Sequence, residues 1–230
     1  MRLFASLPRR ALPALIASLT LAGCGTVPTV LMSDDARTRI HVVNVNPIVK
    51  LPEKLSYNGP GQGAVALLGG PIGILVASST ADGPRGQLTA EMQAHQIVPG
   101  DIFASSFARQ ASDASPMKFV VGAANADAQV ELSIIAYGFV NSGPLSSTLY
   151  PLCNVTAVMK TPDGRIVWQA TEFAGPLRSE INEGHTFDEF AKDPELLRRM
   201  VAAGSDVASH LLVENFMGRE KQPSVPAVLQ

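Results

Sequence analysis

The sequence predicts an α/β fold, with α+β as the alternative, built as a single mixed β-sheet with helices packed on it and an amphipathic helix near its C-terminal end. Three observations support this prediction. Apolar and polar residues alternate within residues 127–140, as in a half-buried strand. Residues 152–173 alternate on both sides of the turn sequence Pro162-Asp163-Gly164, as in a β-hairpin. Apolar residues recur at helical spacing along residues 197–211, and helices between and after strands favour one covered sheet.

The chain begins with the features of an export signal. Arg2, Arg9 and Arg10 precede an apolar run over residues 11–21, and small residues follow it. The run is shorter than the roughly 20 residues of a membrane-spanning helix. We therefore expect residues 1–23 to be a signal peptide rather than part of the fold.

The end of this signal, Leu21-Ala22-Gly23-Cys24, resembles the lipobox of bacterial lipoproteins. The resemblance implies that diacylglycerol is attached to the Cys24 thiol, that the signal is cut before it, and that the new amino terminus is acylated, with a chain such as palmitate. Three such chains hold a protein on a bilayer almost permanently. Residue 25 is glycine rather than the aspartate of retained lipoproteins, which implies an outer-membrane location facing the periplasm. An ordinary cysteine after a secretory signal, or a short membrane anchor, are the alternatives.

The mature chain is expected to form one periplasmic domain. Residues 24–38 lack a sustained period and are interpreted as a lipidated tether, residues 39–217 as a single α/β domain, and residues 218–230 as a disordered tail. Residues 40–45, which are rich in β-branched side chains, predict a first strand. Residues 50–62 are interpreted as a polar turn region.

The middle of the domain predicts two short helices and two strands. Leu88 and Met92 lie four residues apart on one helical segment, and Pro99-Gly100 separates it from a second one with Phe103 and Phe107 on its apolar face. Strands are predicted at residues 118–121 and 127–140. In the longer strand three alternate residues face the core: Val130, Leu132 and Ile134.

The hairpin and the last helical region follow. Alternation in the hairpin places Cys153 in the core as a small apolar residue. Thr186 with Glu189 predicts a capping box at the start of the helical region, and Asp193-Pro194 predicts a break into two helices. The second helix carries a stripe of apolar and small residues: Leu197, Val201, Gly204, Ala208 and Leu211.

Residues 126–139 and 155–173 together resemble a group of periplasmic lipoproteins that share a sheet like that of the amino-terminal domain of TolB. The group includes the curli secretion channel lipoprotein and auxiliary lipoproteins of transport systems. The resemblance lies in two features. One is a strand that follows a start of small residues ending in Ala-Asp, here Ala126-Asp127. The other is a hairpin whose return strand holds Trp168 after an Asp-Gly turn. It implies a role in envelope assembly or transport. Because the matched residues are core and turn positions, it implies no catalytic set.

Composition excludes some classes of protein. The sequence has 18 basic and 20 acidic residues, and three of the basic ones lie in the signal, so the mature chain is acidic. Binding of a nucleic-acid backbone needs clustered Lys and Arg, so nucleic acid is not an expected partner. If Cys24 carries lipid, Cys153 remains without a partner for an internal disulfide.

No motif in the sequence predicts catalysis, a cofactor or a metal site. His41, His95, His185 and His210 are far apart and have no second ligand at metal spacing. Residues 115–118 fit the S-x-x-K pattern of penicillin-binding enzymes, but the companion motifs are missing. The expected protein is therefore not an enzyme and has no cofactor.

Residues 63–79 form an uncharged, glycine-rich stretch with three alternative interpretations. Ala66 with Gly70, and Gly69 with Gly73, repeat the small-x-x-x-small spacing that lets two backbones approach closely. The first interpretation is a buried part of the domain. The second is a contact surface for a partner or a second copy, and the third is a membrane-inserted segment. Pro71 and the cost of glycine in an exposed helix argue against the last.

The main hypothesis is a non-enzymatic, lipid-anchored periplasmic protein that assists the assembly or organisation of a cell-envelope or transport complex. One alternative is an envelope enzyme whose site is built from scattered residues. The other is a ligand- or lipid-binding module that serves a transporter.

Overall fold

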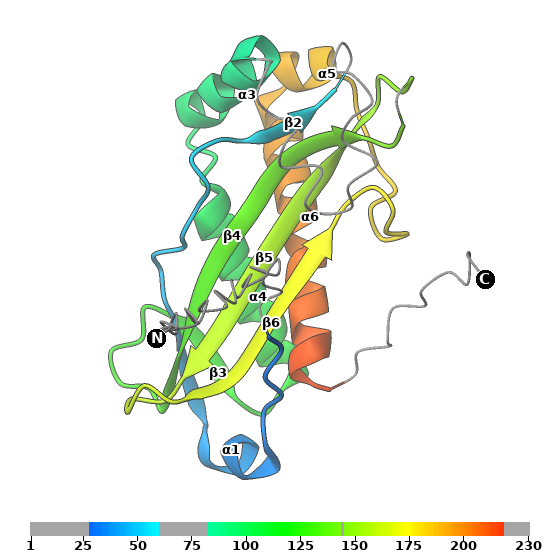
Figure 1. Cartoon of the computed structure of the whole chain (residues 1–230). Coiled ribbons are helices and arrows are strands. Elements are labelled where there is room, and N and C mark those ends of the chain that lie inside the picture. Colours follow the sequence, from blue (N-terminus) through cyan, green and yellow to red (C-terminus); the bar gives the residue numbers. More distant parts are fainter. Residues whose placement is uncertain (1–27, 60–81, 144, 219–230) are drawn as a thin grey trace, which may run out of the picture.

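One mixed sheet with helices on one face forms the domain, which confirms the predicted fold class (Figure 1). The structure is a computed structural model, and it describes residues 28–59, 82–143 and 145–218. The signal peptide, Cys24 and residues 63–79 lie outside the described residues.

The six strands run parallel on one side of the sheet and antiparallel on the other. Their order is β3-β1-β4-β5-β6, and β2 also pairs with β4. β1 is parallel to β3 and β4, β2 is parallel to β4, and β4, β5 and β6 form an antiparallel meander. The strand bounds are β1 Val42–Val45, β2 Ser56–Asn58, β3 Lys118–Val121, β4 Ala128–Asn141, β5 Leu149–Lys160 and β6 Ile166–Ala174.

The predicted hairpin is formed by β5 and β6. The Gly164 amide donates to the Thr161 carbonyl at 2.8 Å, and Gly164 has a φ of +83°, a conformation that favours glycine. Cys153 is buried, as predicted.

Two long helices, α4 (Pro99–Ala114) and α6 (Pro194–Phe216), cover one face of the sheet (Figure 1). Between them and the sheet lies the main core, whose centre is Trp168, fully buried in β6. Its ring stacks on Phe107 of α4, with centroids 6.2 Å apart, and meets Phe216 of α6 edge-on at 5.3 Å. The aromatic residues therefore join both helices to the sheet.

The C-terminal helices begin and end as predicted. Thr186 and Glu189 form the capping box of α5 (Phe187–Lys192). The Asp193 carboxylate then accepts from the Leu196 amide at 3.0 Å and starts α6. Four residues of the predicted stripe are buried, whereas Leu211 is half-buried and Leu212 takes the core position beside it.

A smaller core lies at the far end of the sheet, where α3 (Asp82–Ala94) and α5 pack near β2 (Figure 1). β2 falls in the segment predicted as polar turns, so that prediction is wrong at residues 56–58. Ser56, Tyr57 and Asn58 are all buried. Three residues are too few to show a period, and their pairing partner lies about 80 residues away in β4.

The start of the described chain folds onto the domain. Residues 34–38, interpreted as part of the tether, lie in α1 (Asp34–Arg39), and Ser33 caps this helix by accepting from the Ala36 amide at 3.3 Å. Met32, Ala36 and Ile40 belong to the main core. No helix in the three described stretches of chain is long and apolar enough to span a membrane.

Candidate functional site

The sheet face opposite the main core carries a row of polar side chains across three strands. The register places Asn44 of β1 opposite Gln129 of β4, and Gln129 opposite Lys160 of β5. Since alternate residues of a strand point to opposite faces, the neighbours Val43, Val45 and Val130 are fully buried in the core below.

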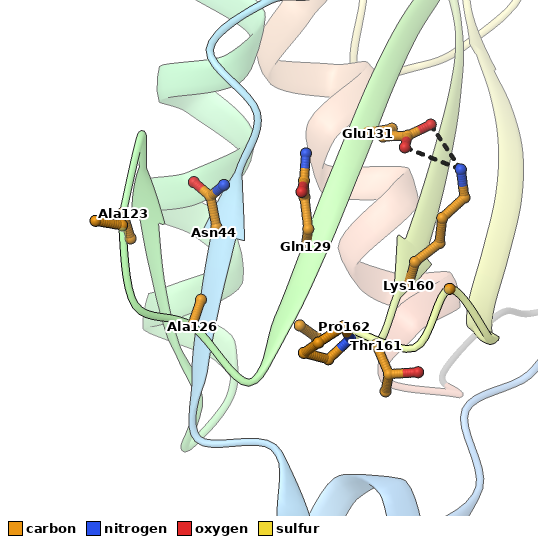
Figure 2. Close-up of a pocket in the computed structure, with 11 residues that line it drawn as sticks. Asn44, Ala123, Ala126, Gln129, Glu131, Lys160, Thr161 and Pro162 are labelled. Carbon is orange, nitrogen blue, oxygen red and sulfur yellow. Dashed lines mark hydrogen bonds and ion pairs between the residues drawn. The ribbon is translucent and has the colours of Figure 1, made fainter.

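A hollow of about 350 Å³ lies over this row. Figure 2 shows Asn44, Gln129, Glu131 and Lys160 around it, with Thr161 and Pro162 of the hairpin turn at one end. The loop between β3 and β4 supplies the remaining wall with alanines, whose small side chains leave the space open: Ala123, Ala124 and Ala126.

One ion pair lies at the edge of the hollow. The Lys160 ammonium donates to both carboxylate oxygens of Glu131, each at 2.9 Å (Figure 2). Both side chains are about one third exposed, so water screens the pair, and its contribution to stability is under about 1 kcal/mol. The pair presents a carboxylate and an ammonium side by side to a polar ligand.

Asn44 adds an unsatisfied hydrogen-bond acceptor. Its Oδ1 is shielded from solvent and accepts no hydrogen bond. An unpaired buried acceptor of this kind destabilises a fold by about 1–3 kcal/mol. A ligand hydroxyl or amide that donates to Asn44 would remove this penalty, so the row is suited to hydrogen bonding with a polar group.

The predicted site residues fall on parts of the chain that the structure does not describe. Cys24, Ala66, Gly69, Gly70 and Gly73 all lie outside the described residues. Cys153 is inside the main core, where burial raises the pKa of its thiol to about 12, so it is neither a ligand nor a nucleophile at neutral pH.

The other candidates for chemistry lie apart from the hollow. The Ser115 hydroxyl bonds the Ala111 carbonyl at the end of α4, whereas Lys118 starts β3, so the S-x-x-K pattern does not lie on one helix. His185 contacts Glu183 and Glu189. In the described stretches, no three His, Cys, Asp or Glu side chains are grouped to hold a metal ion.

No local pattern in the sequence predicts the row of Asn44, Gln129 and Lys160. These residues are 85 and 31 positions apart in the chain, and only the strand register brings them together. The alternation that predicted β4 and β5 places the polar residues of each strand on the outer face of the sheet. It does not say which residue of β4 lies opposite which residue of β5, so it cannot predict the row.

Comparisons with known proteins found distant structural similarity. No protein-family model matches the chain, and no curated protein sequence matches it. A single-substitution variant of PelC from Paraburkholderia phytofirmans, a dodecamer, is similar with a TM-score of 0.36 and 14% identity, over 79% of this chain and 97% of that chain. A second PelC dodecamer from this organism has a TM-score of 0.35 and 13% identity, over 80% and 96%. A Xanthomonas campestris protein of family DUF330 has a TM-score of 0.35 and 14% identity, over 52% and 63%.

Proposed function

We propose that this chain is a non-enzymatic, lipid-anchored periplasmic protein of the outer membrane that assists the assembly or organisation of a cell-envelope or transport complex. The observation that carries the proposal is the attachment of the first described residues to the sheet edge. Val30 and Gln169 of β6 exchange two backbone hydrogen bonds, both of 2.9 Å. The Gln169 side chain also donates to the Pro28 carbonyl at 2.9 Å.

This attachment supports a domain held close to the bilayer. Pro28 is four residues after Cys24, and four residues span at most about 14 Å. A lipid on Cys24 would therefore place the bilayer surface near the β6 edge. A short link of this kind limits rotation of the domain, which suits a protein that holds an assembly at the membrane.

The α1 contacts reinforce the same attachment. The Arg37 guanidinium donates to the Phe216 carbonyl at the end of α6 and lies over the Phe216 ring, 5.1 Å from its centroid. The segment after the proposed lipid site is thus connected both to β6 and to α6.

Lipid attachment is tested with the two cysteines as matched variants. In a Gram-negative host supplied with labelled palmitate, the full chain is expected to carry the label and to fractionate with the outer membrane. Cys24→Ser should lose the label and appear in the soluble periplasmic fraction, whereas Cys153→Ser should behave like the unchanged protein. A labelled Cys24→Ser protein, or an unchanged one without label, would contradict the anchor.

The assembly role is tested at the hollow. A photo-crosslinking residue in place of Thr161 should join the chain to one defined envelope protein or to a second copy. The same residue in place of the exposed His210 of α6 serves as the control. Equal products at both positions would count against a specific contact.

The hollow favours a second candidate function, a ligand-binding module that serves a transporter. Its volume is near the lower end for small-molecule sites, and Asn44 has a free acceptor. In this case the residue at position 161 would crosslink to a small molecule and not to a protein.

A further inference from the structure

Arg85, in the first turn of α3, is a buried charged group without a partner. Its side chain is 4% exposed. Its three guanidinium nitrogens, Nε, Nη1 and Nη2, are shielded from solvent and make no hydrogen bond. Because arginine stays protonated in proteins, this is a full positive charge removed from water, which strongly destabilises a fold unless an anion compensates it.

The chain near Arg85 offers little internal compensation. Glu53 lies beside the same cavity but makes no ion pair with Arg85, and Glu91 of α3 lies 3.6 Å from His95. Residues 60–81, which precede α3, contain no Asp or Glu, and neither do residues 1–27. These segments therefore have no side-chain carboxylate to supply. Asp82 lies three positions before Arg85 at the start of α3, but the Arg85 guanidinium makes no hydrogen bond.

A cavity of about 290 Å³ lies between α3 and the residues before β2. Arg85 and Lys54 line it together with Thr89, Gln93 and Glu53, so its wall is formed by two basic residues and one acidic residue among others. α3 lies beside β2 at the end of the sheet (Figure 1). Positive partial charge on the first turn of a helix repels a cation such as Arg85 and attracts an anion.

We infer that Arg85 and Lys54 form a binding site for a phosphate group at the start of α3. A guanidinium, an ammonium and a helix N-terminus are the groups that bind phosphate in proteins. A bound phosphate would give the buried guanidinium its counter-charge and would offset its repulsion by the helix. The site is separate from the hollow over Asn44 and does not depend on the lipid anchor.

The test uses the full chain in detergent and the pair of variants Arg85→Met and Arg109→Met. Arg109 is exposed on α4 and pairs with Asp206 at 3.0 Å, so its replacement controls for loss of a surface arginine. Inorganic phosphate should bind the unchanged protein and Arg109→Met equally. Arg85→Met should lose at least about tenfold in affinity, since a charge-assisted bidentate contact is removed.

Thermal unfolding gives an independent readout that separates this site from a structural role. In phosphate-free buffer, Arg85→Met should melt at a higher temperature than the unchanged protein, because it removes an uncompensated charge. Added phosphate should raise the midpoint of the unchanged protein but not of Arg85→Met, with sodium chloride at equal ionic strength as the control. A lower midpoint for Arg85→Met without phosphate, or equal phosphate affinity, would overturn the inference.

Two further arms identify the source of the phosphate. Binding of inorganic phosphate without binding to phosphatidic acid vesicles assigns a soluble ligand. In the Cys24→Ser protein, which has no lipid to insert into a bilayer, binding to phosphatidic acid vesicles but not to phosphatidylcholine vesicles, lost on adding Arg85→Met, assigns a lipid headgroup. Binding to neither probe would overturn the proposal.

Discussion

The backbone carbonyl oxygen of Ser56 in β2 occupies the space that a side chain at Gly138 of β4 would need. Gly138 also has a φ of +145°, which residues other than glycine rarely adopt. The two strands are paired in parallel at this point, so β2 is attached to the sheet through a contact that only glycine permits.

We therefore expect Gly138→Ala to displace β2 and to lower the free energy of unfolding by about 3 kcal/mol or more, since backbone strain and overpacking add. Urea unfolding followed by the fluorescence of Trp168 measures this change. Gly164→Ala is the control, because Gly164 has a φ of +83° but no neighbour within 4 Å of an added Cβ. Gly164→Ala should lower the free energy of unfolding by only about 1 kcal/mol, from backbone strain alone. Equal losses would show that β2 is not held by this approach.

The buried hydrogen bond of Trp168 predicts a second effect. Its Nε1 donates to the Asn215 Oδ1 at 3.2 Å in the main core. Asn215→Leu should lower the free energy of unfolding by about 1–3 kcal/mol, because the indole N–H is left unsatisfied. The loss should shrink when Asn215→Leu is made in a Trp168→Phe background, with unfolding followed by circular dichroism. An undiminished loss would assign the effect to other contacts of Asn215.

His185 predicts a dependence of stability on pH. The His185 imidazole donates a hydrogen bond to the Glu183 carboxylate at 2.8 Å, which raises the pKa of His185, and Glu189 raises it further. Because the pKa of His185 is higher in the folded than in the unfolded protein, the charged imidazole stabilises the fold. This stabilisation is complete below the pKa of the unfolded state, about 6.5, and is lost as pH rises through the pKa of the folded state.

The free energy of unfolding should therefore fall slightly between pH 6 and pH 8, by less than about 1 kcal/mol because both glutamates are exposed. Urea unfolding at the two pH values measures it. Glu183→Gln should flatten the change, and an unaltered pH profile in this variant would exclude His185 as its cause.

Burial of Cys153 predicts that its thiol does not react in the folded protein. Its pKa is raised to about 12 by burial, so little thiolate exists at neutral pH. In the Cys24→Ser protein, where it is the single thiol, a thiol reagent should label Cys153 only at urea concentrations that unfold the chain. Fast labelling without urea would mean that β5 opens locally.

The sequence predicted the elements that have a period, and it missed those that depend on long-range pairing. β4, the hairpin of β5 and β6, and the two C-terminal helices show alternation, a turn sequence or a cap within a few residues. β2 and α1 are short, and β2 depends on Gly138, far away in the chain. For the same reason neither the Asn44–Gln129–Lys160 row nor the isolation of Arg85 could be predicted, because both depend on which segments lie side by side.

The bonds between Val30 and Gln169 have a mechanical consequence. With a lipid on Cys24, tension between the membrane and the domain would enter the fold at Pro28. The hydrogen bond from the Gln169 side chain to the Pro28 carbonyl would be loaded first and the two backbone hydrogen bonds at Val30 next, ahead of the strands of the sheet. If they broke and α1 unwound, the eleven residues from Val30 to Ile40 would span up to about 35 Å. A short, stiff link would thus become a long, compliant one under load while the main sheet stayed folded.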